Sequence, residues 1–302
     1  MGTDPQTSHH RPTAMPARLP KNSCDTHLHV FGDAKTYPAA NPNALYAPPE
    51  DCNVATLQAL HAAMGIDRAV LVQPTIYGTD HRLLCDILKA APNYRGVAIV
   101  DDSVGDAELD RLNSVGVRGA RFNFGSRFKL APSVALFRRG LARVRELGWF
   151  VKIFGFEDDF LVVADELRRI DFPAIIDHLG GPDFRRGTQQ PAVRLILDLL
   201  QEGNWWIGLS NGDLRSHAGY PWNDAVAFGR LFYEAAPDRC LWATDWPHVH
   251  RFMRPDKDGH SDYGVDHEMQ RVALLERYLP DRVARDRVLV DNPAHFFGFS
   301  NE

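Results

Sequence analysis

Residues 117–156 read VRGARFNFGSRFKLAPSVALFRRGLARVRELGWFVKIFGF. This stretch begins and ends with short apolar runs, Val117–Phe124 and Phe150–Phe156, which are typical of buried strands. The residues between them, Ser133–Leu147, have a helical pattern and are followed by Gly148, which can adopt the left-handed conformation that ends a helix. A strand, a helix and a second strand in this order predict one β–α–β unit of a parallel sheet.

The same alternation continues in both directions along the chain. We expect eight strands, at Ser23–Phe31, Ala69–Pro74, Tyr94–Val100, Val117–Phe124, Phe150–Phe156, Pro173–Gly180, Trp205–Ser210 and Cys240–His248. Helical pattern lies at Asn53–Met64, His81–Ala90, Ala107–Val115, Ser133–Leu147, Asp158–Ile170, Pro191–Glu202, Asn223–Ala235, His267–Leu279 and Asn292–Gly298. No GxGxxG motif follows a strand, which argues against a dinucleotide-binding fold. Eight such units over about 270 residues favour a single-domain (β/α)8 barrel of the TIM type.

Composition limits the class of protein. The chain has 302 residues, of which 44% are hydrophobic, so it can bury a large core. Its net charge of −5 offers no basic field for nucleic acid or an anionic membrane. No apolar run approaches the ~20 residues of a membrane span. The four cysteines form no CxxC pair, which argues against a zinc–cysteine site and favours reduced thiols in the cytoplasm.

The first residues differ in character from the rest. Residues 1–21 are rich in Pro, Thr and His and lack the apolar core of a signal peptide. We expect them to be a disordered extension, with the barrel formed by residues 22–302. The sequence leaves the oligomeric state open, including a homo-oligomer.

Histidines and a carboxylate fall where a barrel carries its active site. His27 and His29 are two residues apart on the first strand and therefore share one face. Two structural histidines held by hydrogen bonds would give the same pattern. However, His178 ends the sixth strand and Asp245 lies in the last one, in TDWPH. Because catalytic groups collect at the C-terminal ends of barrel strands, we expect these four residues to meet.

Several motifs together resemble a known family. They are DTHLHVF at 25–31, VQPTIYGTD at 72–80, VRGARFNF at 117–124, IIDHLGGPD at 175–183, TDWPH at 244–248 and LVDNPAHFFGF at 289–299. The chain resembles the amidohydrolase superfamily over residues 23–299, and more narrowly its 2-pyrone-4,6-dicarboxylate lactonase group. The resemblance implies a distorted (β/α)8 barrel, in agreement with the strand count.

The resemblance also implies roles for individual residues. Asp245 matches the general base that activates the hydrolytic water. The imidazoles that surround and polarise the lactone carbonyl match His27, His29 and His178. The cations that hold substrate carboxylates match Arg121, Arg127 and Arg215. Further substrate-binding candidates in matching segments are Tyr46, Thr75 and Tyr77. Ester hydrolysis needs a base and a stabilised oxyanion, and the planar fork of arginine suits carboxylates, although a single arginine more often forms a surface ion pair.

The same four residues also suggest a metal site. Imidazole and carboxylate suit zinc or a similar divalent ion, which would bind His27, His29, His178 and Asp245. Many superfamily members add a Lys or Glu on the fourth strand and a His on the fifth. Here the fourth strand has neither and the fifth has no His. We therefore expect no required metal, and leave open a weakly held ion.

Two residues depart from the lactonase pattern. His250 replaces a small polar residue after TDWPH, and Lys152 lies within the fifth strand. Either could contact the substrate. Lys152 in particular could be an additional cation for another acidic group, such as a sulfonate, or a buried lysine paired with an Asp or Glu.

These features predict an enzyme that hydrolyses a small anionic lactone. The foremost substrate is 2-pyrone-4,6-dicarboxylate, opened to 4-oxalomesaconate in aromatic-compound degradation. Three alternatives on the same scaffold are a lactonase for a sulfomuconolactone or sugar-acid lactone, with or without zinc, a lactone isomerase, and a metal-dependent decarboxylase. A barrel that binds without catalysis is a further alternative, against which the complete set of three histidines and Asp245 argues.

Overall fold

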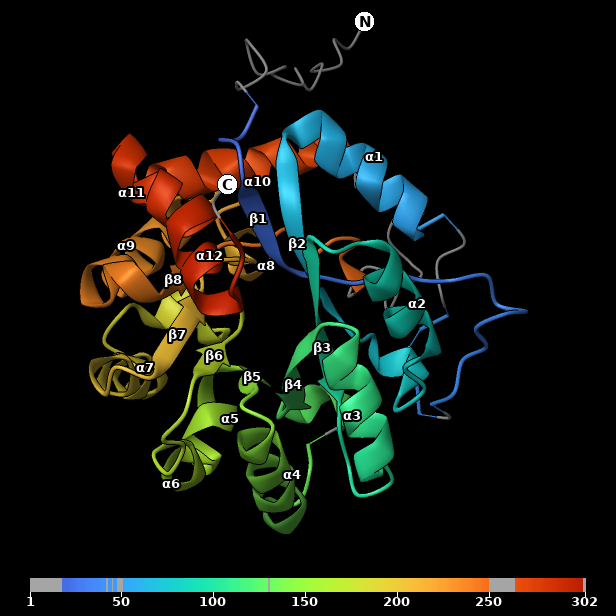
Figure 1. Cartoon of the computed structure of the whole chain (residues 1–302). Coiled ribbons are helices and arrows are strands. Elements are labelled where there is room, and N and C mark those ends of the chain that lie inside the picture. The colour runs from blue at the N-terminus through green and yellow to red at the C-terminus, as the bar shows by residue number, and fades with distance from the viewer. Residues whose placement is uncertain are drawn as a thin grey trace, which may run out of the picture.

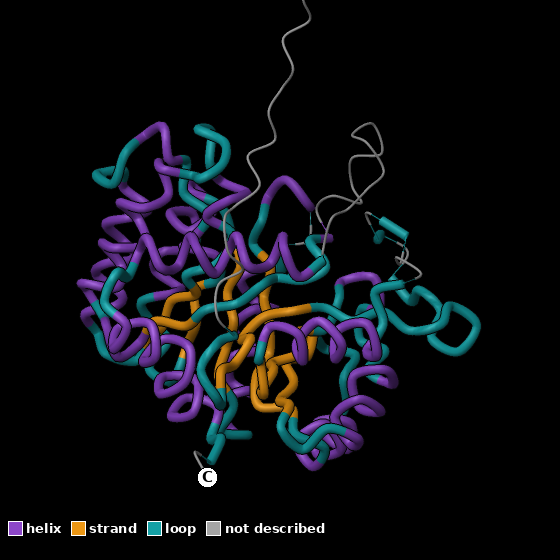
Figure 2. Tube along the Cα trace, turned by 90° about the horizontal axis from the view of Figure 1, so that it is seen from above, coloured by secondary structure: helices purple, strands orange, loops and turns teal. Residues whose placement is uncertain are grey.

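The computed structural model describes residues 18–41, 43–44, 46–47, 51–129, 131–249 and 264–300. Within these residues, eight strands stand at the centre and the helices lie outside them (Figure 2). The strands are β1 (Ser23–Leu28), β2 (Ile66–Val72), β3 (Tyr94–Ile99), β4 (Val117–Asn123), β5 (Phe150–Phe154), β6 (Ala174–Ile176), β7 (Trp205–Gly208) and β8 (Cys240–Leu241). Each strand pairs in parallel with the next along the chain (Figure 1). This is the (β/α)8 barrel predicted from the sequence.

Helices follow the strands around the outside of the barrel. They are α1 (Val54–Met64), α2 (Arg82–Ala90), α3 (Asp106–Ser114), α4 (Val134–Glu146), α5 (Glu157–Val162), α6 (Ala164–Leu167), α7 (Pro191–Gln201), α8 (Gly212–Arg215), α9 (Val226–Ala235), α10 (Val265–Tyr278), α11 (Arg282–Asp286) and α12 (Asn292–Phe297). Short 3-10 turns occur at Thr75–Tyr77, Ser126–Phe128, His178–Gly180, Phe184–Arg186, Asn223–Ala225 and Pro237–Arg239, and a π-helical turn at Arg287–Asp291.

Several strands are shorter than predicted, β6 and β8 most of all. β6 ends at Ile176, and His178 two residues later has a φ of 54°. β8 ends at Leu241, and Asp245 has a φ of 59°. Residues with positive φ cannot continue a strand. Both strands therefore end early, in turns that carry side chains of the predicted site.

Some helices also differ from the prediction. The predicted helix Asp158–Ile170 is divided into α5 and α6, because Val163 between them leaves the helical conformation at φ −109° and ψ 15°. Helices α8 and α11, which are four and five residues long, were not predicted from the sequence. Helices this short contain too few apolar positions to show a helical period.

The predicted helix ends are confirmed at α1. Asn53 caps its beginning, accepting hydrogen bonds from the backbone N–H of Ala55 and Thr56. Gly65 follows its last residue with a φ of 84°, and its N–H donates to the carbonyl of His61. Since glycine has no Cβ, it adopts this left-handed conformation without steric cost. The chain can therefore enter β2 directly at Ile66.

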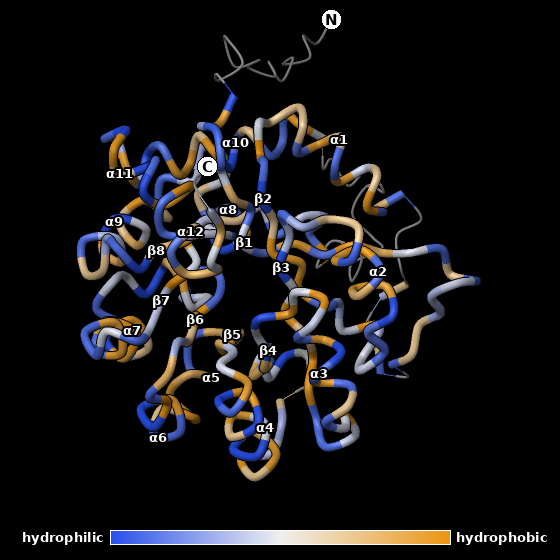
Figure 3. The backbone as a smooth tube through the Cα atoms, viewed as in Figure 1, coloured by the Kyte–Doolittle hydropathy of each residue, from blue (hydrophilic) through white to orange (hydrophobic). Residues whose placement is uncertain are grey.

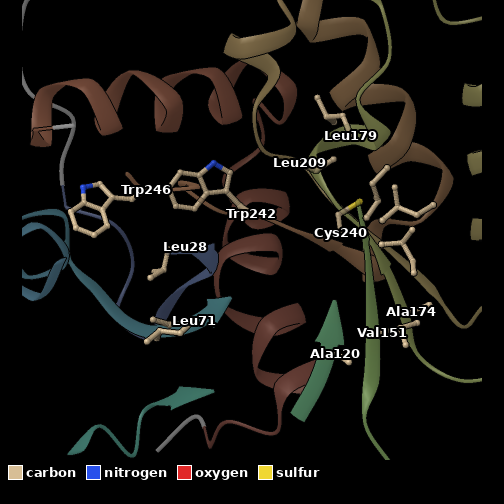
Figure 4. Packing of buried hydrophobic residues seen from close by; sticks show 14 of the residues in the cluster. Leu28, Leu71, Ala120, Val151, Ala174, Leu179, Leu209, Cys240, Trp242 and Trp246 are labelled. Carbon is tan, nitrogen blue, oxygen red and sulfur yellow. The ribbon is translucent and has the colours of Figure 1, made fainter. Parts of the chain in front are cut away.

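An apolar layer joins the strands to the surrounding helices. Leu28 on β1 lies beside Leu71 on β2, and Ala120, Val151 and Ala174 follow one another on β4, β5 and β6 (Figure 4). The helices alternate hydrophobic and hydrophilic residues along their length, as amphipathic surface helices do (Figure 3). This layer accounts for most of the buried apolar residues.

A second apolar cluster fills the base of the barrel interior. It consists of Cys24, Val70, Val72, Val97, Phe150, Ile175, Trp206, Leu241 and Phe297. The Phe150 ring packs where Gly119 on β4 leaves room, because a Cβ at Gly119 would lie 2.5 Å from that ring. Phe297 of α12, whose ring centroid is 5.5 Å from that of Phe150, contributes from outside the sheet. We call this set the base cluster.

Hydrogen bonds between β1 and the segment that includes β8 close the barrel. The backbone N–H to carbonyl bonds are Thr26 to Trp242 (3.1 Å), Asp245 to His27 (2.9 Å) and His29 to Trp246 (2.8 Å). The buried carboxylate of Asp25 adds to them by accepting from the Thr244 N–H at 3.0 Å. We call these contacts the seam. Two of its three backbone bonds involve residues of the predicted site.

The first described residues belong to the folded structure. Leu19 is buried, and its N–H donates to the carbonyl of Met64 at the end of α1. Residues 18–21, which we assigned to the N-terminal extension, thus lie against the barrel. None of the helices in the described ranges combines the length and apolar character that crossing a membrane requires.

Candidate active site

Asp245 is held in a fixed orientation at the mouth of the barrel. It follows β8 in the left-handed conformation, at φ 59°, and its N–H donates to the carbonyl of His27 on β1. Its Oδ2 accepts a hydrogen bond of 2.7 Å from the side chain of Asn211, which follows β7 and is itself left-handed at φ 60°. Such conformations cost about 1–2 kcal/mol per residue outside glycine and cluster at functional sites. The backbone therefore aims this carboxylate at a cost in stability.

Three imidazoles converge on the other oxygen of this carboxylate. The Nε2 atoms of His27 and His29 each lie 3.6 Å from Asp245 Oδ1, and the Nε2 of His178 lies 3.9 Å from it. All four side chains are buried. The structure thus brings together the four residues that the sequence predicted to meet.

Each histidine is oriented through its opposite ring nitrogen. The Nδ1 of His29 donates to the Val72 carbonyl at 2.8 Å, because a carbonyl can only accept. The Nδ1 of His178 is 2.8 Å from the Ser210 hydroxyl, and that of His27 is 3.2 Å from Asp177 Oδ1. Neutral His29 therefore carries its lone pair on Nε2, towards Asp245.

Burial determines the charge states in this cluster. Burial, aided by the nearby Arg121, lowers the pKa of His29 to about 3. Burial also holds the pKa of His27 well below its usual range, against the attraction of Asp177. Burial raises the pKa of the Asp245 carboxyl. The site is thus a carboxylate of increased basicity among imidazoles that are neutral at His27 and His29.

The cluster fits a divalent metal ion. Two groups bring donor atoms within 4.8 Å of one another: His27, His29 and Asp245, and His27, Asp177 and His178. The Nε2 of buried His27 has no hydrogen-bond partner among the described residues. Histidines that hold a metal commonly donate their other N–H to a carbonyl or carboxylate, as His29 does here. The donor set is therefore suited to zinc or a similar ion.

Lys152 is paired inside the barrel. Its ammonium contacts Asp177 Oδ1, and both side chains are 2% exposed. Burial alone would raise the pKa of Asp177, but the charge of Lys152 and the contact with His27 hold it well below its usual range. This is the buried pair that the sequence left open for Lys152. A contact between Lys152 and substrate remains a prediction, and His250 lies outside the described residues.

The three predicted arginines occupy two depths. Arg121 lies on the inner face of β4, buried next to Lys152 on β5, and donates to the Gln73 carbonyl at 3.3 Å. Burial lowers the pKa of Arg121. Arg127 and Arg215 lie at the rim, with their guanidinium carbons 4.8 and 5.3 Å from the centre of the Phe156 ring.

The rim arginines share a carboxylate that the sequence analysis did not single out. The Glu157 carboxylate contacts Arg215 through one oxygen and lies 3.5 Å from Arg127 through the other. The aromatic rings of Phe154 and Phe156 connect this group to His178, with centroid distances of 5.7 and 5.1 Å. The rim group therefore lies beside the histidine cluster.

The remaining candidates separate into two groups. Tyr46 is buried, and burial raises its pKa to about 12, against a hydrogen bond with Thr75. Both Arg121 and Asp245 act electrostatically on Tyr46, so Tyr46 and Thr75 belong to the site region. The Tyr77 hydroxyl instead accepts from the Gly32 N–H at 3.0 Å. Tyr77 thus fastens the loop after β1.

Two residues that the structure places beside the predicted ones were not predicted from the sequence. Asn211 holds Asp245, and Glu157 holds the rim arginines. Each follows a strand directly, as a polar residue in SNGD after β7 or in FGFED after β5. Position after a barrel strand was the available signal, because the C-terminal ends of the strands carry the functional groups.

Comparisons with known proteins agree with the barrel fold. The amidohydrolase family model matches residues 24–299. A 4-sulfomuconolactone hydrolase of Rhizobium radiobacter and a 2-pyrone-4,6-dicarboxylate hydrolase of Comamonas testosteroni are each 34% identical to this chain, covering 93% of it and 91% of their own length. The apo structure of an Agrobacterium tumefaciens protein superposes with a TM-score of 0.79 at 26% identity, covering 94% of this chain and 98% of that one.

Proposed function

The chain belongs to the amidohydrolase family, and from this premise we propose that it hydrolyses a small acidic lactone, with 2-pyrone-4,6-dicarboxylate as the foremost substrate. One observation carries the proposal. Three imidazole Nε2 atoms lie within 3.9 Å of a single oxygen of the buried Asp245 carboxylate. A basic carboxylate in such surroundings suits the activation of a water beside an ester carbonyl.

Asp245 is the general base of this proposal. A water at Oδ1 gives its proton to the carboxylate while its oxygen bonds to the lactone carbonyl carbon, and the π electrons move onto the carbonyl oxygen. Asn211 keeps Oδ2 occupied, so Oδ1 is the oxygen that accepts. When the tetrahedral intermediate collapses, the ring C–O bond breaks and the leaving oxygen takes the proton back from Asp245. Water is consumed, and the base is restored.

The developing negative charge needs stabilisation. Arg121 is buried close enough to lower the pKa of His29, so it contributes a fixed positive charge at this depth. The imidazole ring edges surround the same space. A divalent ion such as zinc, held by His27, His29, His178 and Asp245, would supply further positive charge to the carbonyl oxygen and to the water.

The arginines select the substrate class. Arg121 lies inside the barrel while Arg127 and Arg215 lie at the rim, so acid groups at two positions on one small ring would meet separate cations. The second candidate substrate is 4-sulfomuconolactone, because a relative that is 34% identical to this chain is named 4-sulfomuconolactone hydrolase. Both compounds are lactones with more than one acid group, which this arrangement favours.

A turnover assay tests the proposal. Chelator-treated protein is mixed with 2-pyrone-4,6-dicarboxylate, and loss of the pyrone absorbance is followed, with and without added zinc; 4-sulfomuconolactone is assayed in parallel. Ring opening of the pyrone supports the proposal, and its dependence on zinc decides whether the ion is needed. Turnover of 4-sulfomuconolactone alone would replace the foremost substrate with the second. If neither lactone is turned over, with or without zinc, the proposal is refuted.

A matched pair of variants links that activity to the site. Arg121→Met removes the buried cation, whereas Arg138→Met removes a surface arginine that pairs with Glu166. We expect the first to lose activity and the second to retain it. Equal activities of the two variants would show that turnover does not depend on the buried cluster described above.

A further inference from the structure

The rim of the barrel holds two arginines and one glutamate in a compact group. Arg215 Nη2 contacts one carboxylate oxygen of Glu157, and Arg127 Nη2 lies 3.5 Å from the other. Both guanidinium groups are positioned over the ring of Phe156. Two cations that share one carboxylate, each through a different oxygen, reproduce the way in which arginines hold a bound acid group.

The backbone of Glu157 is fixed, and among the described residues its carboxylate is anchored by these two arginines alone. The N–H of Glu157 donates to the Gly181 carbonyl at 3.3 Å, and Arg215 Nε donates to the Pro182 carbonyl at 3.2 Å. In the described part of the chain, no other side chain is paired with the Glu157 carboxylate. Rotation about its own side-chain bonds would therefore release both cations together without moving the backbone.

The exposure of the group allows such an exchange. The side chains of Glu157 and Arg215 are 14% and 16% exposed, whereas that of Arg127 is 59% exposed. An acid group can approach from solvent along Arg127, and the displaced carboxylate can reach water. The Lys152–Asp177 pair, with 2% exposure on both sides, has no such route. The two ion pairs of the site thus differ in whether a ligand can replace the anion.

We propose that Glu157 is a specificity-determining residue, an internal anion that occupies the Arg127–Arg215 pair until an acid group of the substrate displaces it. This inference rests on the proposed function, because it assigns the rim arginines to an acidic substrate. With Glu157 in place the group carries a net charge of +1, from two cations and one anion. A neutral lactone cannot displace the carboxylate, so the rim admits ligands that bring their own negative charge.

A purely structural role for Glu157 makes the opposite prediction. If the carboxylate serves to orient the arginines, then its removal disorders them and weakens the binding of an acid. If the carboxylate competes with the ligand, then its removal leaves two uncompensated cations and strengthens the binding. The sign of the change in affinity therefore separates the two roles.

Binding of isophthalate tests the inference without turnover. This planar 1,3-dicarboxylate has no ester bond, so the full-length, chelator-treated protein cannot hydrolyse it. Calorimetry compares wild type, Glu157→Gln and the control Glu166→Gln, which removes a glutamate paired with a surface arginine. We expect Glu157→Gln to lower the Kd by about tenfold, the scale of one partly exposed ion pair, and the control to leave it unchanged. An unchanged or higher Kd in Glu157→Gln would overturn the inference.

Two further variants secure the result. Glu157→Asp keeps the charge but shortens the side chain, so it also binds isophthalate more tightly if the carboxylate competes; it substitutes for the glutamine variant should that one fail to fold. In the double variant with Arg127→Met and Glu157→Gln, we expect the gain in affinity for isophthalate to be lost. Because isophthalate is not a substrate, tighter binding with no lactone turnover would retain the role of Glu157 and refute the proposed function, while turnover without tighter binding would do the reverse.

Discussion

The inner face of the barrel changes character between two neighbouring positions of the same strands. On β5, Phe150 belongs to the base cluster, and Lys152 belongs to the charged mouth. On β6, Ile175 packs in the base cluster, and Asp177, the first residue after this strand, pairs with Lys152. Since residues two apart on a strand share a face, one apolar layer directly supports one charged layer.

The two layers make opposite contributions to stability. The base cluster buries aromatic and aliphatic side chains, which stabilises the folded state. The mouth buries carboxylates and places His178, Asn211 and Asp245 in left-handed conformations, which costs stability. This barrel therefore keeps its unfavourable features at the end where the proposed chemistry occurs. Substitutions at the mouth should reduce activity, and those at the base should reduce stability.

The largest expected effect is that of Asp245→Asn. Loss of the general base should lower kcat by about a thousandfold. Burial raises the pKa of Asp245, so the carboxyl stabilises the fold below its unfolded pKa, and this contribution is lost as pH rises through the folded pKa. The neutral amide avoids that loss, so the variant should melt at or above the wild-type temperature at pH 8 once both proteins are treated with chelator. Near-normal kcat would contradict the assignment of the base.

Lys152→Met should be an exception to this division, because it lies at the mouth and should nevertheless reduce stability. Removing one partner of a buried ion pair leaves Asp177 uncompensated and should lower the free energy of unfolding by about 4 kcal/mol at pH 8. In the wild type, the pKa of Asp177 is held low, so the stability it contributes is present above its unfolded pKa and is lost as pH falls below about 4. Without the ammonium, burial raises that pKa, and the variant regains stability as the carboxyl protonates.

Denaturant unfolding at several pH values checks this expectation. The gap between wild type and Lys152→Met should be widest at pH 8 and should narrow towards pH 4. Lys89→Met is the matched control, because Lys89 lies 3.5 Å from Asp86 in an exposed pair and should change stability by less than about 0.5 kcal/mol. A gap that does not depend on pH would show that the lost stability comes from packing and not from the ion pair.

Phe297→Ala should reduce stability from the base cluster while leaving activity nearly unchanged. Truncating this buried ring, which packs 5.5 Å from Phe150, should cost about 3 kcal/mol. Because the change lies in the lower layer, kcat at a temperature where the variant is folded should remain within about twofold of wild type. Val283→Ala, at an exposed position of α11, is the control for a change in size alone. A large loss of kcat with little change in melting temperature would show that the layers are not independent.

The sequence predicted those features of the fold and the site that can be recognised within a single segment of the chain. All eight strands are apolar runs between turn residues, so their existence and order were predictable. His27 and His29 show a spacing of two within β1, and Asp245 lies in a run typical of the family. Asn211 was not predictable in this way, because its role depends on a contact with a residue 34 positions away. Arg215 was predicted, but its pairing with Glu157 was not, because the two residues are 58 positions apart.

The seam links the order of folding events to the appearance of activity. Its contact between Asp25 and Thr244 spans 219 residues, so it closes a long loop of the chain on which the site depends. The same closure brings Asp245 to His27, through the bond between their backbones. Intermediates whose ring is still open can hold many helices and most strands, yet they cannot bring the base to its histidines. In a refolding experiment, we therefore expect turnover to recover when the ring closes, later than the recovery of helical structure.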